Sequence, residues 1–140
     1  MTVLWTFAVL GASAQVRSKP PQATYSYHDS ATVHTVKVAF VNKTTIRFDM
    51  ALRNRKTGHV CVLRGEAHTE PGGSTGVDTD EAGNGYLALA FNYYQGPVFV
   101  SFEFQLQRPL WHSPRLQIGA SGQRIGCDYN STEYILARDN

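Results

Sequence analysis

The segment 119–129, GASGQRIGCDY, brings several side chains suited to recognition close together. Ser121 offers a hydrogen-bond donor and an acceptor, which suits a carboxyl group in either protonation state. Arg124 adds a planar guanidinium that can pair with a carboxylate through two parallel hydrogen bonds. Gly122 supplies the backbone freedom that a tight turn needs. The segment is therefore either a plain turn between strands or a contact loop for a partner protein.

Cys61 and Cys127 are the only cysteines of the chain. In an oxidising compartment they are expected to form a disulfide, and the alternative is two unrelated buried thiols. A bond between residues so far apart in sequence would stabilise the fold by roughly 4 kcal/mol in the chain-entropy description. A cysteine-based metal site needs further ligands at close spacing, so no metal site is predicted.

The histidines and acidic residues do not form a catalytic or metal-binding pattern. Metal ligands on one strand face lie two residues apart, and no two histidines do so. We therefore interpret each histidine as a surface or rim residue: His28, His34, His59, His68 and His112. The segment 78–85, DTDEAGNG, lacks the later ligands of a calcium loop and is interpreted as an acidic hairpin loop. No hydrolase or phosphate-binding motif is present, so neither an enzyme nor a cofactor is predicted.

The N-terminus has the pattern of an export signal. A short apolar run is followed by Ala12-Ser13-Ala14, which fits cleavage after residue 14. The run is far shorter than the ~20 apolar residues of a membrane-spanning helix, so the mature chain is expected to have no membrane span. We predict a signal peptide over residues 1–14, a flexible mature N-terminus over 15–22, and a secreted or periplasmic location.

The rest of the chain, residues 23–140, alternates apolar and polar residues with the period of β-strands. The clearest run predicts that Val98, Val100, Phe102, Phe104 and Leu106 point inward and that Phe99 points outward. Segments 46–52, 59–69 and 87–91 alternate in the same way, whereas 70–85 is interpreted as a long turn region. These features predict one all-β domain of about seven to eight antiparallel strands, either a small barrel or a sandwich with one disulfide.

Composition excludes some kinds of partner. The net charge is only +2, and lysines and arginines are scattered, so no nucleic acid partner is expected. Two sequences, at Asn42 and Asn130, match the N-glycosylation pattern, which would matter only in a eukaryotic source.

Residues 120–124, ASGQR, resemble the Ser-Gly-x-Arg core of a loop found in periplasmic and membrane-bound inhibitors of C-type lysozyme. Those proteins are small, exported, eight-stranded barrels with disulfides. The resemblance implies that Ser121 enters the lysozyme cleft and bonds a catalytic carboxylate, with Gly122 and Arg124 beside it.

We therefore expect an exported protein that acts by binding another protein, with a lysozyme-type cell-wall hydrolase as the sharpest candidate partner. The alternative is a structural or adhesive envelope protein with an aromatic patch of Tyr93, Tyr94 and Phe99. A hydrolase or ligand carrier is the third possibility, and a cavity lined by titratable groups would favour it.

Overall fold

The computed structural model describes residues 19–70, 75–80, 82–124, 126–129 and 132–140, and the predicted signal peptide lies outside them. In the described residues the only helix is a 3-10 turn, η1 (Leu110–His112). The strands are β1 (Gln22–His28), β2 (Thr32–Asn42), β3 (Thr45–Asn54), β4 (Val60–His68), β5 (Thr75–Thr79), β6 (Gly85–Gln95), β7 (Val98–Gln105), β8 (Arg115–Ser121), β9 (Gln123–Arg124), β10 (Cys127–Asp128) and β11 (Thr132–Arg138).

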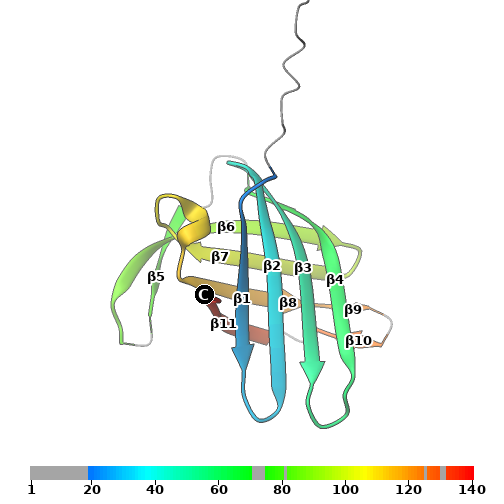
Figure 1. Ribbon diagram of the computed structural model, residues 1–140. Helices are drawn as coiled ribbons and strands as arrows, with labels where there is room; N and C mark the ends of the chain where they lie inside the picture. Colours follow the sequence, from blue (N-terminus) through cyan, green and yellow to red (C-terminus); the bar gives the residue numbers. More distant parts are fainter. Residues whose placement is uncertain (1–18, 71–74, 81, 125, 130–131) are drawn as a thin grey trace, which may run out of the picture.

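The main sheet has the order β4-β3-β2-β1-β11-β8-β7-β6-β5, and every pair of neighbours is antiparallel. A further pairing between His68 of β4 and Asn92 of β6 closes eight of these strands into a barrel. In Figure 1 strands β1 to β4 cross β6 to β8 at a steep angle, as the two walls of a closed barrel do. The all-β class is confirmed, and the architecture is the barrel rather than the sandwich.

Alternating side chains of both walls fill the barrel interior. Phe104 is fully buried, and its ring centroid lies 5.7 Å from that of Tyr25, 5.3 Å from that of Phe40 and 5.8 Å from that of Phe91. The inward parity predicted for Val98, Val100, Phe102 and Phe104 is confirmed, because all four are buried. The aromatic rings occupy the volume that a wider barrel would leave to a ligand.

Leu106 was predicted to point inward with this run, and that prediction is wrong. Strand β7 ends at Gln105, and Leu106 is 42% exposed at the barrel end. The prediction of one long turn over 70–85 is also wrong, because β5 lies inside it and pairs with β6. Strand β5 has few buried positions, so its sequence carries little alternation.

His34 is buried, contrary to its interpretation as a surface or rim residue. It shares the inward parity of Val36 and Val38 on β2, is 2% exposed, and its ring lies 5.0 Å from that of Tyr134. Neither ring nitrogen has a hydrogen-bond partner among the described residues. Burial lowers the pKa of His34 to about 4, because the charged imidazolium loses its hydration.

The core position of Phe104 predicts a large loss of stability on truncation. Phe104→Ala should lower the free energy of unfolding by about 3–5 kcal/mol, because it leaves a cavity among three aromatic rings. Phe99→Ala should cost about 1 kcal/mol, since Phe99 points outward and is only half-buried. Denaturant unfolding measures both values, and equal costs would show that the outer face of β7 is as tightly covered as the core.

Burial of His34 predicts an acid-sensitive fold. The unfolded imidazole binds a proton near its ordinary pKa of about 6.5, whereas the folded one does so only near pH 4. Stability is therefore lost as the pH falls from about 6.5 to about 4, by up to about 3 kcal/mol. The measurement is urea unfolding across this range for the wild type and for His34→Phe. The His34→Phe curve should be flatter, and the curve of His28→Phe, at an exposed position, should follow the wild type.

Candidate functional site

The segment predicted as a contact loop begins a small hairpin at the end of β8. Ser121 is the last residue of β8, the chain turns at Gly122, and β9 then pairs with β10 in the register Arg124 with Cys127. The backbone N–H of Tyr129 donates to the carbonyl of Gly122 at 2.8 Å and fastens the base of the hairpin. The predicted end of a strand at Ser121 is confirmed, and the turn is followed by two short strands.

Gly122 holds the hairpin base against the connection between β6 and β7. Its φ is +100°, which side chains other than glycine rarely adopt. A Cβ atom built at this position would overlap the carbonyl oxygen of Pro97. The backbone of Gly122 therefore approaches the backbone of Pro97 more closely than any other residue type would allow.

The disulfide between Cys61 and Cys127 is formed, as predicted, with the Cα atoms 5.8 Å apart. It joins β10 of the hairpin to β4 on the opposite wall of the barrel, at the lower right of Figure 1. The hairpin is consequently fixed at one end by Gly122 and at the other by a covalent bond.

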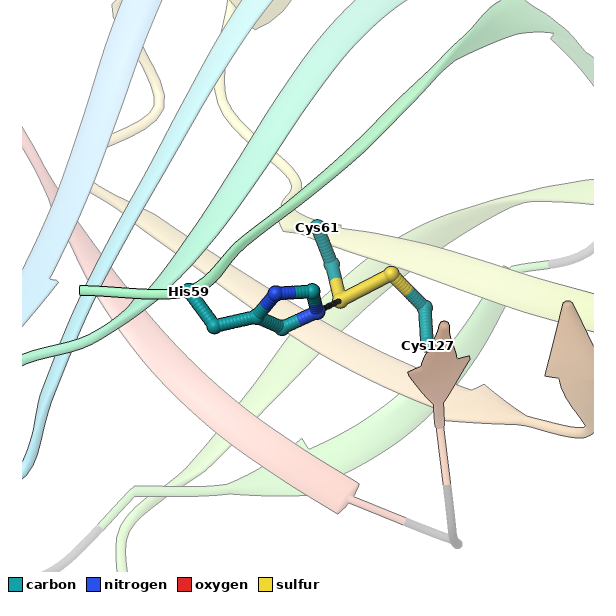
Figure 2. A group of neighbouring side chains, drawn as sticks. All are labelled: His59, Cys61 and Cys127. Atoms are coloured by element: carbon teal, nitrogen blue, oxygen red, sulfur yellow. Dashed lines mark hydrogen bonds between the residues drawn. A yellow bond between two sulfur atoms is a disulfide. The ribbon is translucent and has the colours of Figure 1, made fainter. Parts of the chain in front are cut away.

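A histidine stands beside the bridge and was not predicted there. The Nε2 atom of His59 lies 2.7 Å from the carbonyl of Gly126 and 3.7 Å from Sγ of Cys61 (Figure 2). Because the carbonyl can only accept, Nε2 carries the proton and donates it to Gly126. The His-x-Cys spacing at residues 59–61 was the available signal, since residues two apart in an extended chain point to one side.

His59, Cys61 and Cys127 bring three potential metal-ligand atoms within 4.8 Å of one another. Metals bind the thiolate form of cysteine, and here the two sulfurs are bonded to each other. These residues could hold an ion such as zinc only after reduction of the bridge. In the oxidised chain His59 is a hydrogen-bonding support for the hairpin.

The three predicted contact residues lie at different places on the hairpin. Ser121 is half-buried at its base, Gly122 forms the turn, and Arg124 is exposed on β9. Burial raises the pKa of Tyr129, and the nearby charge of Arg124 lowers it in part. Arg124 therefore lies close enough to Tyr129 to act on it, while its guanidinium still faces solvent.

The predicted aromatic patch is present in part and borders Ser121. Tyr94 is 67% exposed, and its ring centroid lies 4.9 Å from that of Phe99. Phe99 is paired with Ser121 across β7 and β8, so both side chains lie on the outer face of the barrel. Tyr93 instead packs against Phe48, with ring centroids 5.0 Å apart, and does not belong to the patch.

Within the acidic segment 78–85, β5 ends at Thr79 and β6 begins at Gly85, so Asp80 and Asn84 belong to a hairpin connection, as interpreted from the sequence. Oδ1 of Asp80 accepts hydrogen bonds from the backbone N–H groups of Ala82 at 3.0 Å and Asn84 at 2.8 Å. On the adjacent outer face, burial and the neighbouring Asp78 raise the pKa of Glu103. The two hydrogen bonds that Asp80 accepts thus order the loop to which it belongs.

Comparisons of the chain with protein-family models, with curated proteins and with solved structures found no match. Within the described part of the chain, no helix is long and apolar enough to cross a membrane. Of the two predicted glycosylation sites, Asn42 lies at the end of β2, and Asn130 lies outside the described residues.

The contact between Gly122 and Pro97 predicts that Gly122→Ala is more harmful than the same change at Gly126. Both residues have positive φ, so both variants carry the cost of about 1 kcal/mol for a left-handed alanine. Only at position 122 does the new Cβ meet backbone, whereas none of the described atoms lies within 4 Å of it at position 126. Gly122→Ala should therefore lose about 1–3 kcal/mol more, measured by denaturant unfolding with the disulfide intact. Equal losses would show that the hairpin moves away from Pro97 at no cost.

Proposed function

We propose that this protein binds another protein through a surface that combines Tyr94, Phe99 and Ser121 of the outer barrel face with the exposed Arg124 of the hairpin that follows, and we term it the hairpin face. The observation that carries the proposal is that a disulfide-anchored hairpin, which begins directly after Ser121, carries an exposed arginine. A surface held rigid before binding loses little conformational entropy when a partner docks. Aromatic residues and arginine are also the types most often responsible for binding energy in protein interfaces.

The sharpest form of the proposal is inhibition of a lysozyme-type cell-wall hydrolase by occlusion. It is supported by the resemblance of residues 120–124 to the loop of the lysozyme inhibitors and by the small, disulfide-bonded barrel. The catalytic centre of such a hydrolase contains carboxyl groups. Arg124 would pair with one of them, and Ser121 would add a hydrogen bond at the cleft edge. The inhibitor itself performs no reaction and needs no cofactor.

We also propose that the protein is exported. A disulfide is typical of oxidising compartments, which include the periplasm and the extracellular space. Together with the N-terminal pattern of an export signal, it supports a location where cell-wall hydrolases act.

A structural or adhesive envelope role is the second candidate, favoured by the exposed ring of Tyr94 that packs against Phe99. Adhesion through this pair would depend on Tyr94 and would not need Arg124. The two candidates therefore differ in which variant removes binding.

The test is to measure whether the purified, oxidised protein slows lysis of bacterial cells by a C-type lysozyme. Ser121→Ala and Arg124→Ala should each weaken inhibition about ten- to hundredfold, the loss expected for a hydrogen bond to a charged group in a desolvated cleft. Their unfolding midpoints should barely change, because Arg124 is exposed and the Ser121 side chain is small and only half-buried. Lys43→Ala removes an exposed positive charge from the β2–β3 turn at the other end of the barrel and should have no effect.

Absence of binding to every class of lysozyme would contradict the inhibitor form of the proposal. Inhibition that survives both Ser121→Ala and Arg124→Ala would place the contact surface elsewhere. Loss of binding in Tyr94→Ala alone, with Arg124→Ala unaffected, would favour the adhesive role.

A further inference from the structure

The barrel end opposite the hairpin carries an open depression of about 670 Å³, which we term the barrel mouth. Along β8, Leu116 pairs with Phe104 near the mouth and Ser121 pairs with Phe99 near the hairpin, so the two regions lie at opposite ends. This volume is within the range of small-ligand sites, about 300–1,000 Å³, and the mouths of barrels are a frequent place for them.

Apolar and aromatic side chains form much of the wall of the barrel mouth, and Asn42 and Gln107 add polar groups to it. The apolar lining includes Phe40, Leu89, Leu106 and Trp111. The ring centroids of Phe40 and Trp111 lie 6.4 Å apart, so strand β2 and helix η1 contribute two adjoining rings. Phe40 also packs on Phe104, which separates the depression from the filled core below it.

Exposed apolar side chains also lie outside the depression. The backbone N–H of Leu106 donates to the carbonyl of Leu87 at 2.7 Å, and Leu87 pairs with Val77 on β5. Leu87 is 51% exposed and Val77 is 76% exposed. Neither Leu87 nor Val77 lines the depression, so this exposed apolar rim is separate from the barrel mouth.

Two cations, Lys43 and Arg108, stand at the edge of the same depression. Both are exposed, and no acidic residue is among the described residues that line it. Lys43 comes from the turn between β2 and β3, and Arg108 from the connection between β7 and η1. An apolar trough flanked by positive charges fits a ligand with an apolar chain and one anionic end.

We propose that the barrel mouth binds a single-chain amphipathic anion, such as a fatty acid. The carboxylate lies between Lys43 and Arg108, and the hydrocarbon chain lies along Phe40, Leu106 and Trp111. The site shares no residue with the hairpin face, so it stands whether or not the protein inhibits a hydrolase.

The experiment is isothermal titration of the full, oxidised protein with monomeric decanoate, compared with decanol and with decyltrimethylammonium. Decanoate should bind at least tenfold more tightly than either analogue. In the series hexanoate, octanoate and decanoate, each added methylene should tighten binding about two- to fourfold, because each buries apolar surface.

Variants separate the charge from the apolar wall. Lys43→Ala combined with Arg108→Ala should weaken decanoate about tenfold and leave decanol unchanged. Leu106→Ser should weaken both ligands, whereas Leu87→Ser, also exposed but outside the depression, should weaken neither. Unchanged unfolding midpoints would show that all three variants are folded.

Three results would overturn the proposal: no binding of decanoate below about 1 mM, equal affinity for the anion and the cation, or identical effects of the two leucine variants. Binding seen with lipid vesicles but never with monomeric decanoate would also overturn it, because the surface would then recognise a membrane.

Discussion

The structure depends on how the sheet closes between β4 and β6. We call this closure between β4 and β6 the seam. Among the described residues its strands pair at one end only, through His68 and Asn92. Further along, the ring of Tyr93 leans over Gly65 of β4, where any larger residue would overlap it. At the far end the Cys61–Cys127 bridge joins β4 to the hairpin. The pairing of His68 with Asn92, the packing of Tyr93 on Gly65 and the disulfide thus close the barrel here. They take the place of the continuous hydrogen-bond ladder that a regular barrel would have.

The seam explains the position of the β9–β10 hairpin next to β4. An unpaired strand edge is a template for association with other chains, and β4 exposes Val60 and Val62. The bridge brings β9 and β10 to this edge, and His59 holds the turn of the hairpin through the carbonyl of Gly126. The same bond also fixes the hairpin that carries Arg124. One structural requirement therefore produces the surface to which we assign recognition.

Sequence patterns predicted the strands in which one face is buried and the other is exposed. The alternation from Val98 to Phe104 identified β7 and its inward face, because one side of that strand lies wholly in the core. Strand β5 was missed because it pairs only with β6 and has few buried residues, so nothing in its sequence alternates. His34 was predicted at the surface because it is a histidine, although it shares the inward parity of Val36. The bridge was predicted from the two cysteines together with the expected export to an oxidising compartment, whereas its contact with His59 depends on β4 and β10 meeting across the barrel.

The bridge also divides the chain mechanically. It encloses β4 through β10 in a loop 66 residues in sequence separation and leaves β1, β2, β3 and β11 outside. A protein pulled from its two termini could extend only through the outer strands, while the enclosed loop stays slack. At about 3.5 Å per residue, this shortens the fully stretched length by about 230 Å. Tension on an anchored molecule would thus detach β1, β2, β3 and β11 and leave the bond between Cys61 and Cys127 carrying the load.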